Sequence, residues 1–258
     1  MNLFSIITVT YDDFENFKNT FESVKSQTFS EYEWVVINGR KNDDTDEYVK
    51  KIGLNNLFYL AEKDEGLYDA MNKGIYNSKG KYLIFLNSGD VFSNKGILQE
   101  ISNLINSSNT SPDFIYGDSN EINSKGDLFY RKSRNLWRKS IGMFTHHQTM
   151  FYRRDILMNN KLIYNQDYHI AADYDFTLQF LNNSEINVYY PKSICNFKQG
   201  GLAHTNWKEG LKQQYSTRSK TIKMNFLTNK FIYYLQYILH QVRFNFKGLY
   251  NIYRFKRN

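Results

Sequence analysis

Polar and acidic side chains follow four apolar runs in the first ninety residues, at the points where the runs end. These polar segments are residues 10–13, 38–45, 62–66 and 87–90. If the apolar runs are parallel strands, their carboxyl ends meet at one edge of a sheet, where open α/β sheets bind ligands. Acids gathered there bind a phosphate poorly unless a divalent cation lies between them. The spacing therefore indicates a site for a phosphorylated ligand, with a metal ion as a partner.

The acids in these segments do not all have the same expected role. Asp43 and Asp44 directly precede a helical pattern, and Asp is common at helix N-caps, so we predict that they are capping residues. Asp90 lies too far before the helix predicted at Ile97 to cap it. We therefore assign Asp64 and Asp90 to ligand binding.

Several common kinds of site have no motif in this sequence. No GxGxxG follows the first apolar run, and no GxxxxGK[ST] occurs, which argues against dinucleotide binding and P-loop phosphoryl transfer. A single cysteine excludes a disulfide framework and a cysteine-based zinc site. No convincing Ser-His-Asp or Cys-His set is present, so nucleophilic catalysis is not indicated.

The elements that must position these residues alternate between strand and helix patterns. Strands are predicted at 3–10, 33–38, 57–61 and 81–87, and helices at 14–24, 43–51 and 66–77. This alternation predicts a mostly parallel sheet with helices on both faces. Later patterns predict an antiparallel extension: helices at 97–105 and 173–181, and strands at 113–122, 127–131 and 186–190, with a hairpin turn at 123–126.

Length and composition fit one large domain or one domain with an appendage. It has 258 residues, of which 41% are hydrophobic, and a net charge of +7. There is no signal-peptide pattern at its start and no long uncharged apolar stretch, so we expect a cytoplasmic protein without a spanning helix.

The positive charge is concentrated in the last fifth of the chain. Residues 206–258 hold eleven Lys or Arg and one acid, whereas residues 1–205 carry a net charge of −3. Two basic, aromatic helices are predicted here, which is typical of a segment that lies on an anionic membrane surface. Packing on the catalytic domain or on another subunit is the alternative. No nucleic-acid readout motif appears. We further expect residues 228–258 to be dispensable for the chemical step.

Four segments together resemble a known family. FSIITVTYDD, VVINGRKNDDTDEYV, EKDEGLYDAMNKGI and GKYLIFLNSGD match, in order and spacing, the nucleotide-binding half of family 2 glycosyltransferases with the GT-A fold, in the bacterial branch that builds surface polysaccharides. HHQTMFYRRDI and IAADYDFTLQF extend the resemblance to about residue 205. It implies a Rossmann-like catalytic domain at 1–205, divided into a nucleotide-sugar half at 1–90 and an acceptor half at 91–205, followed by the C-terminal segment.

The resemblance also implies roles for the strand-end residues. Thr10 and Tyr11 would border the base and ribose, and Asn38 stands where the family usually has an acid that binds uracil. An amide there can still pair with a base. Asp64 would be a second nucleotide-contacting acid, and Gly66 precedes the next helix. Asp69 and Asn72 lie on one face of that helix, where they would hold the loop or contact the sugar.

The predicted metal and catalytic residues lie further along the chain. Residues 87–90, Asn-Ser-Gly-Asp, replace the family's Asp-x-Asp motif, so Asn87 would contact the donor and Asp90 would be the lone carboxylate for Mn²⁺ or Mg²⁺. Asp173 matches the family's general base, with Asp175 read as a helix-surface acid. His147 would lie near the donor phosphates or the acceptor.

The implied activity is inverting sugar transfer. The donor would be a nucleoside diphosphate sugar, expected to carry UDP, and the acceptor a lipid-linked saccharide at the inner face of a bacterial membrane. The product would enter an O-antigen, a capsule or an exopolysaccharide. A nucleotidyltransferase and a non-catalytic nucleotide-sugar-binding scaffold are the alternatives, and a homo-oligomer is left open.

Overall fold

The computed structural model describes residues 2–123, 125–198 and 205–245. The first half of the sheet and its helices are β1 (Phe4–Thr10), α1 (Phe14–Lys25), β2 (Tyr32–Asn38), α2 (Asp44–Ile52), β3 (Leu57–Ala61), α3 (Leu67–Asn77) and β4 (Tyr82–Phe85). Then come β5 (Val91–Phe92), α4 (Ile97–Ser107), β6 (Phe114–Ile122), β7 (Leu128–Arg131), the 3-10 helices η1 (Leu136–Ser140) and η2 (His147–Thr149), β8 (Met150–Arg153), α5 (Arg154–Asn159), α6 (Ala172–Leu181) and β9 (Asn187–Lys198). The last two helices are α8 (Trp207–Lys220) and α9 (Phe226–Asn245).

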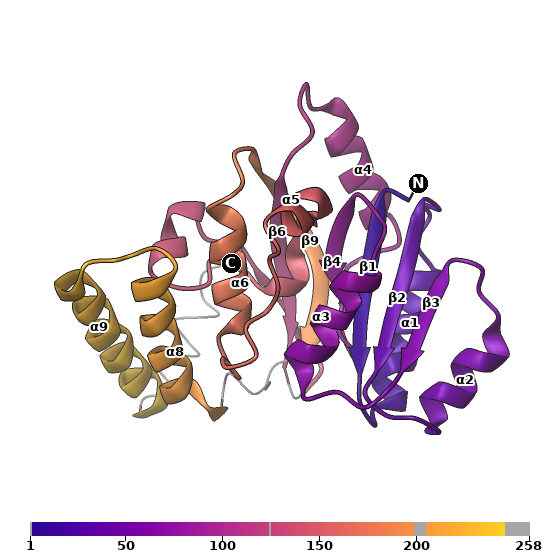
Figure 1. Cartoon of the computed structure of the whole chain (residues 1–258), viewed down its shortest axis with the longest axis horizontal. Helices are drawn as coiled ribbons and strands as arrows, with labels where there is room; N and C mark the ends of the chain where they lie inside the picture. Colours follow the sequence, from indigo (N-terminus) through magenta and orange to yellow (C-terminus); the bar gives the residue numbers. More distant parts are fainter. Residues whose placement is uncertain (1, 124, 199–204, 246–258) are drawn as a thin grey trace.

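One mixed sheet runs through the molecule, in the order β3-β2-β1-β4-β8-β6-β9-β5, with β7 paired to β6. Strands β3, β2, β1 and β4 are mutually parallel, and β8 joins them antiparallel to β4. The α/β class and the antiparallel extension are thus confirmed, although β6 and β9 within the extension are parallel. The carboxyl ends of the four parallel strands lie at the edge of the sheet opposite the N-terminus in Figure 1.

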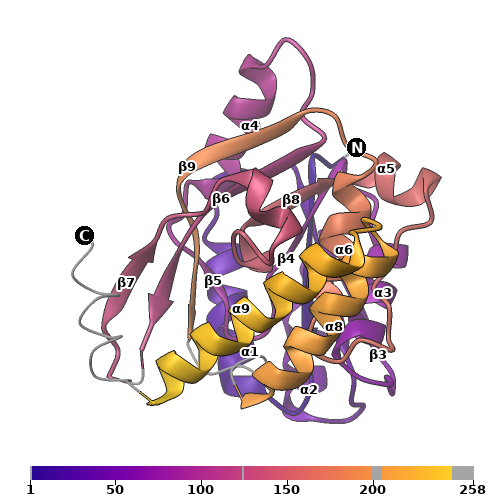
Figure 2. The same ribbon diagram turned by 90° about the vertical axis from the view of Figure 1, so that its left-hand side faces the viewer.

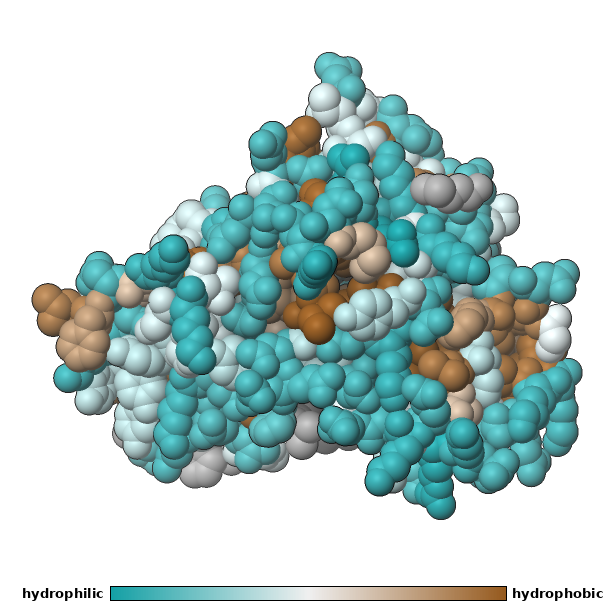
Figure 3. Space-filling model, viewed as in Figure 1, coloured by the Kyte–Doolittle hydropathy of each residue, from teal (hydrophilic) through white to brown (hydrophobic). Residues whose placement is uncertain are grey.

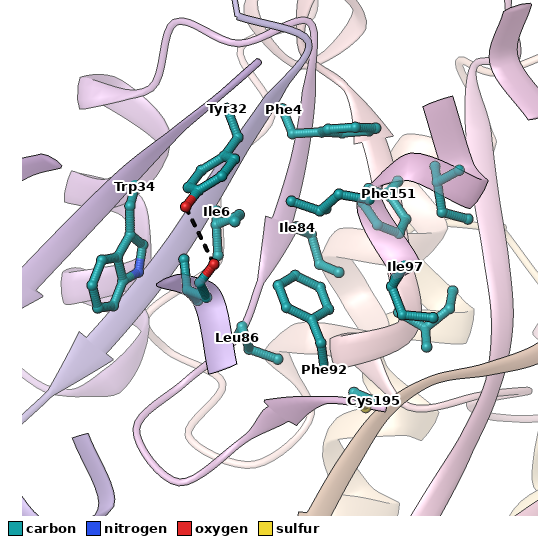
Figure 4. Close-up of a cluster of buried hydrophobic side chains, with 14 of the residues drawn as sticks. Phe4, Ile6, Tyr32, Trp34, Ile84, Leu86, Phe92, Ile97, Phe151 and Cys195 are labelled. Carbon is teal, nitrogen blue, oxygen red and sulfur yellow. Dashed lines mark hydrogen bonds between the residues drawn. The ribbon is translucent and has the colours of Figure 1, made fainter. Parts of the chain in front are cut away.

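Two apolar layers cover the two faces of this sheet. Alternate residues of β1 divide between them: Ile6 packs in the layer under α1 and α4, and Ile7 in the layer under α3, α5 and α6. Figure 4 shows part of the first layer, with the Tyr32 hydroxyl donating to the Val24 carbonyl at 3.2 Å. Near-continuous apolar strands such as β1 are therefore explained by burial on both sides.

Helices α8 and α9 lie side by side at the end of the molecule far from β2 and β3 (Figures 1 and 2). Arg218 of α8 is fully buried and donates to the Asn229 side chain at 2.7 Å, to the Ile141 carbonyl at 2.8 Å and to the Gln236 side chain at 3.2 Å. Asn229 is also fully buried. Because α9 supplies Asn229 and Gln236 to this arginine, the described part of the C-terminal segment packs on the rest of the domain, as the alternative interpretation expected. The dispensability of residues 228–258 for the chemical step stays a prediction. Residues 246–258 lie outside the described residues.

Candidate functional site

Three strand-end loops meet at the edge formed by β1, β2 and β3. Gly39 follows β2, and a Cβ placed on it would lie 2.1 Å from Oδ2 of Asp64 and 2.9 Å from the ring of Tyr11. The absence of a side chain at Gly39 therefore allows the loops after β1 and β3 to close on each other. The Tyr11 ring is 64% exposed beside a half-buried Asp64, whose pKa is raised by burial. An exposed ring next to a carboxylate can stack on a planar base and accept one of its N–H groups.

A surface ion pair ties the loops after β1 and β2 together. Arg40 Nη1 lies 2.6 Å from Oδ2 of Asp12, and the backbone N–H of Gly39 donates to the Thr10 carbonyl at 3.0 Å. The Thr10 hydroxyl is buried and has no hydrogen-bond partner within the described residues. Thr10 therefore supports the cluster through its backbone, below the exposed Tyr11.

Asn38 lies beneath this edge instead of facing it. The residue is fully buried, and its amide nitrogen donates to Asp43 at 2.9 Å and to the Tyr59 hydroxyl at 3.0 Å. Its amide oxygen accepts the backbone N–H of Arg40 at 3.1 Å. These bonds use both N–H groups of the amide and one acceptor position of its oxygen, and the residue is buried, so the contacts do not support the expected pairing of Asn38 with a base. Asp43, in turn, caps α2 as predicted.

The segment between β3 and α3 is held by hydrogen bonds and an ion pair among its own residues and those of α3. Gly66 has a φ of +125°, which favours glycine, and its N–H donates to Asp64 at 3.1 Å. Asp69 lies 3.1 Å from the ammonium of Lys73 and accepts the Glu65 N–H at 3.1 Å. Asn72 is buried, and both ends of its amide bond the backbone of Tyr164, so its contacts are those of the loop-holding role.

A second cluster forms where η2 packs on the loop after β4. The His147 ring lies 3.3 Å from the amide nitrogen of Asn87, and Gln148 donates to Asp90 at 3.1 Å. Asp90 is 8% exposed, and burial raises its pKa to about 7, although the bond from Gln148 opposes the rise. Two adjacent residues of η2, His147 and Gln148, thus contact Asn87 and Asp90 of the loop at residues 87–90.

Asp173 is the second residue of α6 and lies close to His147 of η2. Its Oδ2 lies 3.9 Å from Nδ1 of His147, and its Oδ1 accepts the Tyr174 N–H at 2.7 Å. The N-terminus of a helix favours a carboxylate. Burial nevertheless raises the pKa of Asp173 to about 6, close to the value at which a carboxylate serves as a base near neutral pH.

His147 is a neutral neighbour of Asp173 and not a partner in an ion pair. Burial, with a smaller contribution from His146, lowers the pKa of His147 to about 4. A separation of 3.9 Å also exceeds hydrogen-bond distance. The imidazole therefore connects Asn87 and Asp173 spatially while leaving the carboxylate available to another proton donor.

The donors near Asp90 suit a hard cation that brings most of its own ligands. Within the described residues, no group of three or more His, Cys, Asp or Glu is arranged to hold a metal ion. Asp90 supplies one buried carboxylate, and the buried amide oxygen of Asn87 has no hydrogen-bond partner among the residues that the structure describes. Mg²⁺ and Mn²⁺ accept few protein oxygens when water and substrate phosphates complete their coordination.

Comparison with known proteins decides which chemistry this edge serves. A profile described as glycosyl transferase family 2 matches residues 5–160, which is more than half of the chain. The chain belongs to this family. Its sequence is 29% identical over 210 residues to a PGL/p-HBAD biosynthesis glycosyltransferase of Mycobacterium bovis, a match that spans 79% of this chain and 80% of the relative.

Solved structures confirm the GT-A fold of this glycosyltransferase. TarS of S. aureus in complex with UDP-GlcNAc is similar with a TM-score of 0.69 and 19% identity, over 90% of this chain and 70% of that one. The mannosyltransferase PcManGT of Pyrobaculum calidifontis, in complex with GDP-Man and Mn²⁺, is similar with a TM-score of 0.65 and 13% identity, over 86% of this chain and 65% of that one. The nucleotidyltransferase and scaffold alternatives are set aside, because family and relatives are glycosyltransferases.

The sequence did not reveal two contributors to the site, Gln148 and Gly39, and it led to one wrong interpretation, that of Asp175. Gln148 contacts Asp90, and the sequence feature that could have indicated this is its position next to His147 in the segment HHQTMFYRRDI. Gly39 allows Asp64 and Tyr11 to meet, and a glycine directly after a strand could have indicated this. Asp175 is a correction: it is buried and bonded to Gln179 and Thr221, so it is not a surface acid.

Proposed function

We propose that this glycosyltransferase is an inverting enzyme that uses a nucleoside diphosphate sugar, expected to carry UDP. The observation that carries the proposal is the contact of η2 with both the Asn87–Asp90 loop and Asp173. One short helix thereby brings a carboxylate suited to a diphosphate-bound cation near a carboxylate suited to a general base. Inverting transfer needs these two groups and no protein nucleophile.

The residues have separate tasks in this reaction. Tyr11 and Asp64 would hold the nucleotide at the edge of β1 to β3, with Gly39 leaving room for both. Asp173 would take the proton of the attacking acceptor hydroxyl as the new glycosidic bond forms and the bond from the sugar to the diphosphate breaks. Asp90, with the Asn87 oxygen, would hold Mn²⁺ or Mg²⁺, which offsets the charge of the leaving diphosphate.

The acceptor is proposed to be a lipid-linked saccharide at the inner face of a bacterial membrane. Similarity to a glycosyltransferase of PGL/p-HBAD biosynthesis supports a biosynthetic role, and similarity to TarS, solved in complex with UDP-GlcNAc, supports a UDP-linked donor. The product would enter an O-antigen, a capsule or an exopolysaccharide.

The C-terminal helices support a peripheral membrane location. No helix among the described residues has the length and apolar character needed to cross a bilayer. The apolar face of α9 instead presents seven large side chains that are 44–77% exposed: Leu227, Phe231, Tyr234, Leu235, Ile238, Leu239 and Val242. Figure 3 shows apolar side chains at the end of the molecule where α9 begins. An apolar helix face in a basic segment is typical of binding to anionic lipid.

A donor screen tests the proposed reaction. Nucleotide sugars are compared by thermal stabilisation and slow donor hydrolysis, with Mn²⁺ and with a chelator. We expect stabilisation by a UDP-sugar that requires Mn²⁺ in the wild type and is lost in Asp90→Asn. Stabilisation that is equal with and without metal would assign the diphosphate to protein groups alone and would contradict the role of Asp90.

A further inference from the structure

The turn that leads into α6 is held from another helix. Its N-cap residue, Ala171, has no side-chain oxygen that could accept an N–H of the first turn. Gln213 of α8 provides an acceptor from outside: its Oε1 accepts the N–H of Ile170 at 2.9 Å and that of Ala171 at 3.0 Å. Gln213 is 6% exposed. A buried acceptor shared by two N–H groups fixes the backbone immediately before Asp173.

Further contacts hold the same turn from two sides. The Tyr68 hydroxyl of α3 donates to the Ile170 carbonyl at 3.4 Å, so both backbone polar groups of Ile170 are bonded, the N–H to Gln213 and the carbonyl to Tyr68. On the α8 side, a Cβ on Gly210 would lie 3.0 Å from Cγ2 of Ile170, so this glycine permits close packing. The Ser216 and Tyr168 hydroxyls lie 2.9 Å apart. The peptide before α6 is therefore clamped between α3 and α8.

We propose that Gln213 is a positioning residue for the Asp173 carboxylate. The proposal rests on the proposed function, in which Asp173 accepts the proton of the acceptor hydroxyl. Gln213 bonds protein atoms and acts through the backbone of α6, which decides where the carboxylate points relative to His147 and the acceptor. A displacement of about 1 Å at a reacting group can reduce a rate on the order of a hundredfold.

The kinetic test compares two neighbouring glutamines. Gln213→Met keeps the length of the side chain and removes the acceptor for Ile170 and Ala171. Gln214→Met is the matched control, because Gln214 bonds Gln236 of α9 at 3.1 Å and has no bond to the turn before α6. We expect Gln213→Met to lower kcat for transfer by roughly tenfold or more with the donor KM unchanged. We expect Gln214→Met to keep kcat near the wild-type value.

A second measurement follows the protonation of the Asp173 carboxylate and does not require sugar transfer. The ¹³C signal of the Asp173 carboxyl, assigned with Asp173→Asn, is followed against pH. Burial raises the pKa of Asp173 to about 6 in the wild type, where His147, Tyr68, Tyr152 and Tyr164 face it. In Gln213→Met the freed turn admits water, so the pKa should fall toward the ordinary range of aspartate, while Gln214→Met should titrate like the wild type.

The outcomes separate the two claims. If the wild type transfers sugar and Gln213→Met changes neither kcat nor the titration, or changes kcat without the titration, the positioning role is overturned and the proposed function stands. If the wild type transfers no sugar but Gln213→Met alone shifts the titration, the proposed function fails and the control of the Asp173 carboxylate by Gln213 is supported.

Discussion

The proposed nucleotide edge and the surroundings of Asp173, the proposed base, are built in opposite ways. At the edge, Tyr11, Gly39 and Asp64 come from three consecutive strand ends that a parallel sheet places side by side. Around Asp173, the neighbours come from α3, η2 and α8, far away in the sequence. The first arrangement follows from strand order, whereas the second depends on how separate helices pack. Substitutions in distant helices should therefore affect the Asp173 carboxylate, the proposed base, more than nucleotide binding.

The largest expected effect isolates the chemical step. Asp173→Asn should lower the transfer rate by about a hundredfold or more with donor affinity retained, because the amide cannot accept the acceptor proton. Asp167→Asn, an exposed acid in the loop before α6, is the control. In the wild type, the rate should fall as the pH drops through about 6, since burial raises the pKa of Asp173 and the protonated carboxyl is inactive as a base. Near-normal transfer by Asp173→Asn would place the base elsewhere.

The next effect tests whether the C-terminal helices belong to the catalytic domain. Arg218→Met should lower the free energy of unfolding by about 2–4 kcal/mol, because Asn229, Gln236 and the Ile141 carbonyl lose a buried donor. Urea unfolding measures this, with the exposed Lys212→Met as the control. Equal stability of the two variants would mean that α8 and α9 contribute little to the fold.

A third prediction addresses the nucleotide edge alone. Gly39→Ala places a Cβ 2.1 Å from Asp64, so the loops after β1 and β3 must separate. Donor affinity should fall on the order of tenfold, with kcat for bound donor little changed. The control is Gly96→Ala, where the nearest atom is the flexible Asn94 side chain at 3.2 Å. A fall in kcat at unchanged donor affinity would contradict the prediction that the loops around Gly39 serve donor binding independently of Asp173.

The smallest effect concerns the apolar face of α9. Phe231→Ser should weaken binding to anionic vesicles by about fivefold, since the side chain is 68% exposed and would enter the lipid interface. Tyr76→Ser removes a similarly exposed ring from α3 and should leave vesicle binding unchanged. Binding that ignores Phe231 at low salt would point to a protein partner, such as a second copy, for this face.

The sequence predicted the sheet well because its signals are local. Strand and helix patterns alternate within short windows, and the parallel strands β1 to β4 formed where apolar runs were followed by polar segments. The same pattern indicated that Asp64 and Asp90 belong to one edge. Asp43 was recognised as a cap because capping needs only the residues that follow it.

Burial and the partners of single side chains could not be predicted this way. Asn38 follows a strand like the other polar residues, yet Asp43, Tyr59 and the Arg40 backbone bind its amide below the surface. Asp175 was expected to be an exposed acid, but it is buried and accepts a hydrogen bond from Thr221, the C-cap residue of α8. The basic residues of the C-terminal segment indicated membrane binding, with packing on the domain as the alternative, and they did not reveal that Arg218 is buried beside Asn229, Gln236 and Ile141.

By itself, therefore, the sequence determined the order of the elements, the edge of the sheet that carries the polar groups and the resemblance that named the base. Only the tertiary structure decided which of those groups face the site and which are buried and hydrogen-bonded to other groups of the protein. The physical reason is that a hydrogen-bond partner such as Gln213 for Ile170 comes from a distant helix, and burial depends on every element packed around a residue.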